Sequence, residues 1–234
     1  MQSAEDVPAD LSQLQHFGPL PGRAGLKARD LVYLTLKRRI LLNDLKPLAA
    51  LTELGVAQDM GCSQGTVREA LLLLQEDGLV LRGGHRGTSV TPLDAEVAEE
   101  MLALRRQIET RAALRSARLM DAATLAQLEF FQSAMDRNAA EGDEFGLIEN
   151  DMRFHMALFQ VSGFQALEQI LKRVILHTHR QKLWEPRHRR PLAETAGRHR
   201  LILSAIAGGG EALAAALGQH VDTIVDVAPE RIAS

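Results

Sequence analysis

The stretch from residue 51 to residue 90 restricts the fold of this chain more than any other part of it. It predicts a short helix over 52–59, a turn at Gly61, and a second helix that begins after the N-cap residue Ser63 and ends at Gly78. The second segment places apolar residues on one helical face, namely Val67, Leu71 and Leu74. The next segments, 79–81 and 88–90, are predicted strands that flank a basic, glycine-rich tip. This order is typical of a winged helix-turn-helix, whose second helix enters a major groove of DNA.

Seven residues of this stretch are the candidates for contact with DNA: Ser63, Gln64, Thr66, Arg68, Gly84, His85 and Arg86. Arg68 suits a guanine edge and Gln64 an adenine edge, whereas Ser63 and Thr66 at the helix N-terminus suit phosphate. The tip at 83–87 can approach a backbone or a minor groove closely. The alternative for Arg68 is an ion pair with a nearby carboxylate such as Glu69 or Glu53.

The run SQGTVREAL at 63–71, followed by EDGLV at 76–80, resembles the DNA-binding domain of GntR-family transcription regulators. Four departures concern the turns and the DNA contacts. Asn43 and Leu48 stand where glycines are usual. Gln64 stands where an arginine is usual, and Leu54 replaces another basic contact seen in some members. The resemblance implies a double-stranded operator with palindromic half-sites, and the departures bear on its base sequence.

The composition of the chain says more about the compartment in which the protein is expected than about its function. Hydrophobic residues make up 46% of the chain and the net charge is −3, so bulk charge does not mark a nucleic-acid binder. The single cysteine, Cys62, excludes an internal disulfide and fits a reducing cytoplasm; packing is the simpler role for it, and a redox switch is the alternative. We find no membrane-spanning apolar run and no signal peptide, so we expect a cytoplasmic protein without membrane contact.

The chain is predicted to be mainly α, with a flexible tail at 1–25, a winged helix-turn-helix domain at 26–92 and an all-helical domain at 93–228. A first helix is expected over 27–42. Beyond Asp94 the helical segments are 94–119, 122–141, 143–161, 163–184, 192–207 and 210–227. Short links between about six helices indicate an antiparallel bundle.

One aspartate and three histidines of the second domain face the predicted bundle interior. Asp151 and His155 are four residues apart on one helix, and His199 and His220 each have aliphatic residues at helical spacing. Each of these histidines alone is more often a hydrogen-bonded core residue. Together, the four inward polar groups need partners, and one metal ion satisfies all of them.

The segments RQIE at 106–109, DMRFH at 151–155, HRLILSAI at 199–206 and His220 resemble the FCD ligand-binding domain of the FadR subfamily. The resemblance implies that Asp151, His155, His199 and His220 bind a divalent metal. It also implies that Arg106 lies near the effector. The alternative for Arg106 is a surface ion pair with Glu109.

A ligand set of nitrogen and oxygen suits Zn, Ni, Mn or Fe and leaves coordination positions open. We therefore expect a small carboxylate effector, paired with Arg106. Four further side chains either line the cavity or only pack: His177, His179, Arg180 and Trp184.

The sequence thus predicts a homodimeric, ligand-responsive transcription regulator, not an enzyme. The resemblance implies repression that the ligand relieves. Two alternatives are a metal-dependent hydrolase, since an open metal site can activate water, and a DNA-binding dimer whose metal is purely structural.

Overall fold

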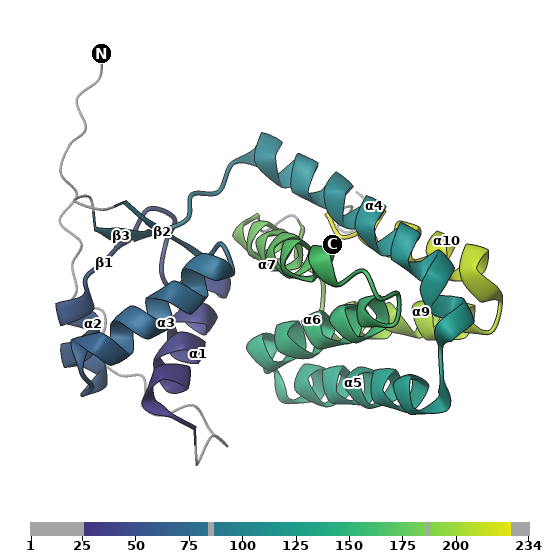
Figure 1. Ribbon diagram of the computed structural model, residues 1–234, viewed down its shortest axis with the longest axis horizontal. Coiled ribbons are helices and arrows are strands. Elements are labelled where there is room, and N and C mark those ends of the chain that lie inside the picture. Colours follow the sequence, from purple (N-terminus) through teal and green to yellow (C-terminus); the bar gives the residue numbers. More distant parts are fainter. Residues whose placement is uncertain (1–25, 84–86, 186–187, 226–234) are drawn as a thin grey trace, which may run out of the picture. The chain divides into compact units, whose positions relative to one another are not determined.

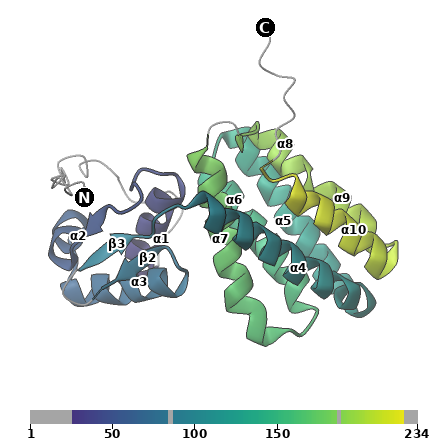
Figure 2. The same cartoon turned by 90° about the horizontal axis from the view of Figure 1, so that it is seen from above.

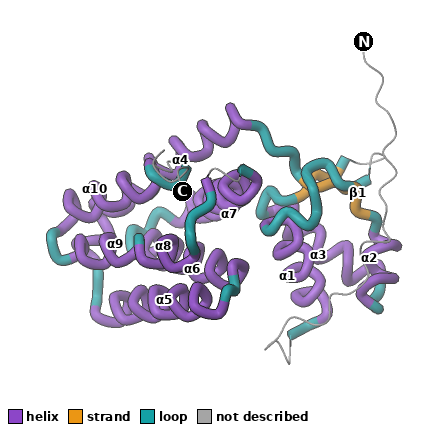
Figure 3. Tube along the Cα trace, turned by 180° about the vertical axis from the view of Figure 1, so that it is seen from behind, coloured by secondary structure: helices purple, strands orange, loops and turns teal. Residues whose placement is uncertain are grey.

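The computed structural model describes residues 26–83, 87–185 and 188–225, and it divides into two compact units between Pro92 and Leu93. The first unit mixes helices with three short strands, whereas the second is built from helices (Figure 3). In the described part of the chain, no helix combines the length and the apolar character needed to cross a membrane. The predicted tail at 1–25 lies outside the described residues.

The first unit is a winged helix-turn-helix, as the sequence predicts. Its elements are α1 (Ala28–Leu41), β1 (Ala50–Leu51), α2 (Glu53–Met60), α3 (Gln64–Glu76), β2 (Val80–Arg82) and β3 (Thr88–Val90). Gly61 makes the turn between α2 and α3 with φ +62°, in the left-handed region that glycine favours. Ser63 caps α3, because its hydroxyl accepts a hydrogen bond from the amide of Thr66 at 3.1 Å. Because of these local signals, α3 begins directly after Ser63, as the sequence predicts.

The three strands form one antiparallel sheet in the order β1-β3-β2. Val80 pairs with Val90 and Ala50 pairs with Ser89. The sequence analysis missed β1, because two residues are too few to show an alternation of period two. The predicted tip residues Gly84, His85 and Arg86 lie outside the described residues.

Two turns of this unit hold non-glycine residues in the left-handed region. Asn43 has φ +63° and Leu48 has φ +66°. These are the positions where the resembling family usually has glycine. Both residues keep a left-handed backbone conformation that glycine adopts easily, so the backbone is strained there. Leu48 keeps its place in the turn through the hydrogen bond from its amide to the carbonyl of Val90 at 3.0 Å.

The second unit is an antiparallel helical bundle. Its elements are α4 (Ala95–Leu119), α5 (Ala122–Glu141), α6 (Glu144–Gln160), the 3₁₀ turn η3 (Gln165–Leu167), α7 (Glu168–Trp184), α8 (Leu192–Gly197), α9 (His199–Ile206) and α10 (Gly209–Asp222). The long helix α4 packs along α10 and α7, and α5 packs along α6 (Figures 1 and 2). The predicted helix 192–207 is divided into two helices at Arg198, whose own backbone dihedral angles remain in the right-handed helical region.

Aspartates cap the first three bundle helices, which explains why their starts are readable in the sequence. Asp94, Asp121 and Asp143 each accept a hydrogen bond from the amide three residues later, at 3.1, 2.7 and 2.9 Å. The apolar core beneath them is fully or almost fully buried and is centred on Leu128, Met135, Phe154, Leu158, Ile202 and Leu213. The metal-ligand candidates lie beside this core.

Candidate metal centre and nucleic-acid interface

The structure brings together the four residues that the sequence predicts as metal ligands. One potential ligand atom from each of Asp151, His155, His199 and His220 lies within 4.8 Å of all the others. All four side chains are buried. Asp151 and His155 project from consecutive turns of α6, His199 is the first residue of α9, and His220 lies in the last turn of α10. Helices α6, α9 and α10 therefore converge on one point.

The contacts inside this cluster leave ring nitrogens without a partner. His199 Nε2 lies 2.9 Å from Asp151 Oδ1 without the geometry of a hydrogen bond, and His155 Nε2 is 4.0 Å from Asp151 Oδ2. His155 Nε2, His199 Nε2 and His220 Nδ1 are buried and have no hydrogen-bond partner. The three imidazole rings are 4.6–5.3 Å apart, centre to centre. Buried unpaired nitrogens of this kind are costly, and a cation held between them satisfies all three, so the residues fit a metal ion.

The protonation states also fit. Burial raises the pKa of Asp151, but the neighbouring His179 and His199 outweigh burial and hold that pKa well below its usual value. Burial lowers the pKa of His220 well below its usual value, with further lowering from His199 and His155, and burial likewise lowers the pKa of His199. The cluster therefore presents an ionised Asp151 together with neutral His199 and His220, which are the forms that bind a metal.

Buried groups around the cluster orient its members. His155 Nδ1 lies 2.5 Å from Glu109 Oε2, and Arg105 Nε donates to Glu109 Oε1 at 2.6 Å. Burial raises the pKa of Glu109, but His155 and Arg105 together lower it to about 2, so the carboxylate is ionised. On the other side of the cluster, His179 Nε2 lies 2.9 Å from Asp151 Oδ2. A carboxylate behind a ligating histidine fixes the ring orientation and its tautomer.

The arginine predicted to reach the effector does not lie at this cluster. Arg106 is half exposed and its Nε donates to Asp222 at 2.8 Å on the bundle surface. The neighbouring Arg105 is buried, contacts Glu109, and has an NH2 group without a hydrogen-bond partner. Consecutive helical residues are 100° apart, so only one of two adjacent arginines shares the inner face. The stripe formed by Ile108, Ala112 and Ser116 would have selected Arg105.

The four further side chains that the sequence offered as cavity candidates differ in burial and in contacts. His179 contacts Asp151, whereas Trp184 is 40% exposed at the end of α7. His177 and Arg180 are buried; burial and the nearby Arg180 lower the pKa of His177 to about 4. Sequence reasoning missed Lys182 on the same helix, which is also buried, because lysine at a helix end normally signals solvent.

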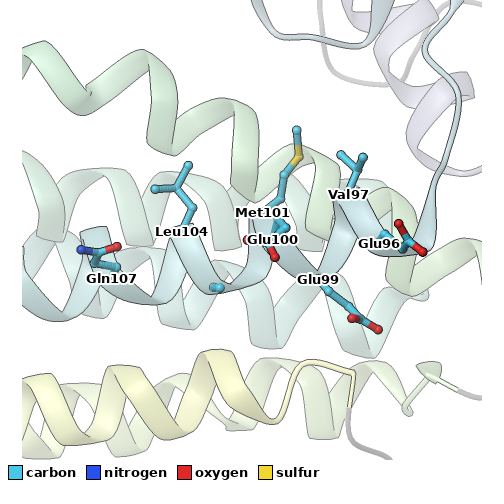
Figure 4. A pocket seen from close by; sticks show the side chains of 8 residues that line it. Glu96, Val97, Glu99, Glu100, Met101, Leu104 and Gln107 are labelled. Atoms are coloured by element: carbon cyan, nitrogen blue, oxygen red, sulfur yellow. The ribbon is translucent and has the colours of Figure 1, made fainter.

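An open groove along the N-terminal half of α4 is a poor place for an organic acid. Among the described residues, α4 alone lines the groove. Its lining side chains include the apolar Val97 and Leu104 and the acidic Glu96, Glu99 and Glu100 (Figure 4). Three carboxylates repel an anionic ligand. The groove includes none of the residues of the metal-ligand cluster.

The start of α3 presents the predicted DNA-contact residues on its surface. Ser63, Gln64 and Arg68 are exposed, and Thr66 is half-buried with its hydroxyl 2.9 Å from that of Ser63. Arg68 forms an ion pair with Glu53 of α2 at 2.7 Å, the alternative that the sequence left open, and Arg82 contacts the same carboxylate at 3.2 Å. The side chain of Arg68 is still 60% exposed, so the ion pair does not remove it from reach of a ligand.

Burial raises the pKa of the Cys62 thiol, which disfavours the reactive thiolate.

The sequence matches two described protein families. The FCD domain matches residues 100–223, which is more than half of the chain, and "Bacterial regulatory proteins, gntR family" matches residues 28–90. The two matched regions fall on either side of the division at Pro92 and Leu93.

Individual relatives agree with both matches. An HTH-type transcriptional regulator from an unstable DNA locus of Streptomyces ambofaciens is 28% identical over 83% of this chain and 82% of its own length. The HTH-type transcriptional repressor RspR of Escherichia coli K12 is 26% identical over 82% and 85%. Among solved structures, E. coli McbR/YncC superimposes with a TM-score of 0.69 at 21% identity, covering 84% of this chain and 94% of that one, which shows a shared fold.

Proposed function

Since the chain belongs to the GntR family of bacterial regulatory proteins and carries an FCD domain, it is a DNA-binding transcription regulator, and we propose that it senses a small organic acid through a divalent metal. The observation that carries this proposal is the buried set of one carboxylate and three imidazoles with unpaired nitrogens. The family consists of transcription regulators, which removes the hydrolase alternative.

Asp151, His155, His199 and His220 would hold the metal. Their oxygen and nitrogen atoms suit Zn, Ni, Mn or Fe, and such an ion supplies a Lewis-acidic position for an oxygen of the effector. Glu109 and His179 keep the two ligands of α6 oriented through contacts of 2.5 and 2.9 Å.

Arg105, rather than Arg106, is the cation that would meet the effector carboxylate. Its guanidinium is buried beside Glu109, and one of its NH2 groups has no partner among the described residues. A buried donor without a partner gains more from a carboxylate than an exposed arginine that already has one. Effector binding at this place would alter how α4, which continues from the winged unit, is held against α6 and α10.

The winged unit would place α3 in a major groove, with Arg68 on guanine and Gln64 on adenine. A homodimer would bind palindromic half-sites, and effector binding would relieve repression. Such a regulator acts where its operator is, in the cytoplasm.

Elemental analysis of the purified full chain tests the metal site. We expect about one divalent ion per chain in the wild type and a large loss in His199→Ala. His177→Ala is the matched control, because it removes a buried histidine that lies outside the cluster. A wild type that stays metal-free after reconstitution would rule out the centre.

Binding to the protein's own promoter fragment tests the DNA contacts. Arg68→Ala should weaken operator binding by about 1–3 kcal/mol and relax base preference at one position of each half-site. Arg106→Ala, an exposed and ion-paired arginine of the other unit, should leave the operator affinity unchanged. If Arg68→Ala binds operator as tightly as the wild type, the recognition helix does not read bases as proposed.

The remaining alternative is a DNA-binding dimer with a structural metal. A screen of hydroxy, keto, sugar and dicarboxylic acids separates the two, with protein melting and operator affinity as readouts. The structural alternative is favoured if the metal is present and no acid changes either quantity.

A further inference from the structure

Lys182 is a buried ammonium group on α7 that the proposed metal centre does not use. Its residue is 8% exposed, and its Nζ donates to the hydroxyl of Thr195 on α8 at 3.3 Å. Among residues 26–83, 87–185 and 188–225, no carboxylate comes within ion-pair distance of this Nζ. Burying a charge without a counter-ion in contact is costly, so the buried ammonium group points to an anionic partner from outside the chain.

A small cavity lies against this ammonium group. It has a volume of about 20 Å³, which is room for about one water-sized oxygen. Leu147, Ile148 and Leu192 are among its apolar lining residues, and Lys182, Thr195 and His179 are among its polar ones. Arg189, Arg190 and Glu144 also line the cavity, and Arg190 forms an ion pair with Glu194 at 3.3 Å. With Lys182 included, these residues keep one positive charge in excess. Burial lowers the pKa of Lys182 to about 8, and the amine is therefore still mostly protonated at neutral pH.

His179 lies between this cavity and the metal-ligand cluster. The same imidazole lines the cavity and lies 2.9 Å from Asp151 Oδ2. An anion at Lys182 is thus separated by one side chain from a metal ligand. The cavity is too small for a whole organic acid, but it matches one oxygen of a terminal carboxylate.

We propose that Lys182 and Thr195 form a second anion subsite, which receives one carboxylate of an effector whose other carboxylate lies at the metal centre. The effector is accordingly a dicarboxylic acid. This inference rests on the proposed function, and it assigns the specificity for the second acid group to α7 and α8.

The test compares acids of equal chain length on the metal-loaded, full-length protein. Malonate, succinate and glutarate are titrated calorimetrically beside propionate, butyrate and pentanoate. We expect at least one dicarboxylate to bind roughly 10–100-fold more tightly than its monocarboxylate, as expected for one charged hydrogen bond. In Lys182→Met this ratio should fall to near 1, with the metal content unchanged. The matched control is Lys172→Met, which removes a charge from the same helix and should keep the ratio.

Two further measurements separate a lost subsite from a damaged fold. Lys182→Met removes a buried charge, so without ligand it should melt at the wild-type temperature or about 2–4 °C above it. Thr195→Val should lower the ratio less than Lys182→Met, because it removes only a neutral partner.

The ratio of affinities decides the outcome. If the wild type binds each pair of acids equally, or Lys182→Met keeps the wild-type ratio or weakens both acids alike, the subsite is refuted. The proposed function still stands if monocarboxylates bind and change operator affinity, whereas it fails with the subsite if the metal-loaded protein responds to no acid.

Discussion

The two units each contain an arginine–glutamate ion pair of almost the same length, in opposite surroundings. In the winged unit, Arg68 and Glu53 are 2.7 Å apart and the arginine side chain is 60% exposed. In the helical unit, Arg105 and Glu109 are 2.6 Å apart and their side chains are 1% and 3% exposed. Water competes with the first pair and is excluded from the second.

This difference in exposure separates an exchangeable contact from a fixed one. An exposed ion pair contributes little, so Arg68 can leave Glu53 for DNA at small cost. A buried pair that loses one member leaves an uncompensated charge, which is strongly destabilising. The winged unit thus keeps its cation available for a ligand, whereas the helical unit uses Arg105 and Glu109 to hold His155 in place.

The largest expected effect comes from breaking the buried pair. Arg105→Met should lower the free energy of unfolding by about 3–5 kcal/mol, because Glu109 remains buried beside His155 with one counter-charge removed. Arg106→Met on the same turn breaks only the half-exposed pair with Asp222 and should cost less than about 1 kcal/mol. Urea unfolding of the two variants checks this, and equal losses would contradict the distinction between buried and exposed pairs.

The next effect concerns buried histidine and pH. Burial and Arg180 lower the folded-state pKa of His177 to about 4, against about 6.5 in an unfolded chain. The unfolded state therefore binds more protons below pH 6.5, and stability falls as the pH falls from 6.5 toward 4. Between pH 7 and pH 5 this histidine should account for about 2 kcal/mol of the loss.

Unfolding of metal-free wild type and His177→Leu at pH 7 and pH 5 measures that contribution. The variant should lose about 2 kcal/mol less than the wild type over this range. Parallel pH dependence in the two proteins would mean that His177 is protonated in the folded state.

A smaller gain is expected in the winged unit. Leu48 has φ +66° and its side chain is largely exposed, so Leu48→Gly should relieve strain while removing little packing. Allowing for the greater flexibility of unfolded glycine, the unfolding free energy should rise by roughly 0.5–1 kcal/mol. Asn43→Gly should gain less, since asparagine tolerates this conformation better. Thermal unfolding of both variants is the measurement, and a destabilised Leu48→Gly would refute the strain.

The smallest effect is expected for the exposed pair. Arg68→Ala should change the unfolding free energy by at most about 0.5 kcal/mol. The same samples used for operator binding can be unfolded in urea at low and at high salt. A loss of unfolding free energy comparable to that of Arg105→Met would show that Arg68 stabilises the fold and is not available to bind DNA.

The sequence by itself determined where the helices begin and which residues share a face. Gly61 and Ser63 mark the helix-turn-helix, and Asp94, Asp121 and Asp143 mark the starts of bundle helices. Such signals act within one turn, so they are readable locally. Helical period also put Asp151 and His155 on one face, and the family resemblance joined them to the other two ligands.

The tertiary structure alone decided which side chains meet across elements. Arg68 pairs with a glutamate 15 residues away, His179 contacts an aspartate 28 residues away, and Lys182 contacts a threonine on another helix. Local spacing fixes the angle between residues of one helix, but the rotation of that helix against its neighbours follows from packing of the whole bundle. For that reason the four metal-ligand candidates could be named from the sequence, whereas the contacts of the buried Lys182 could not.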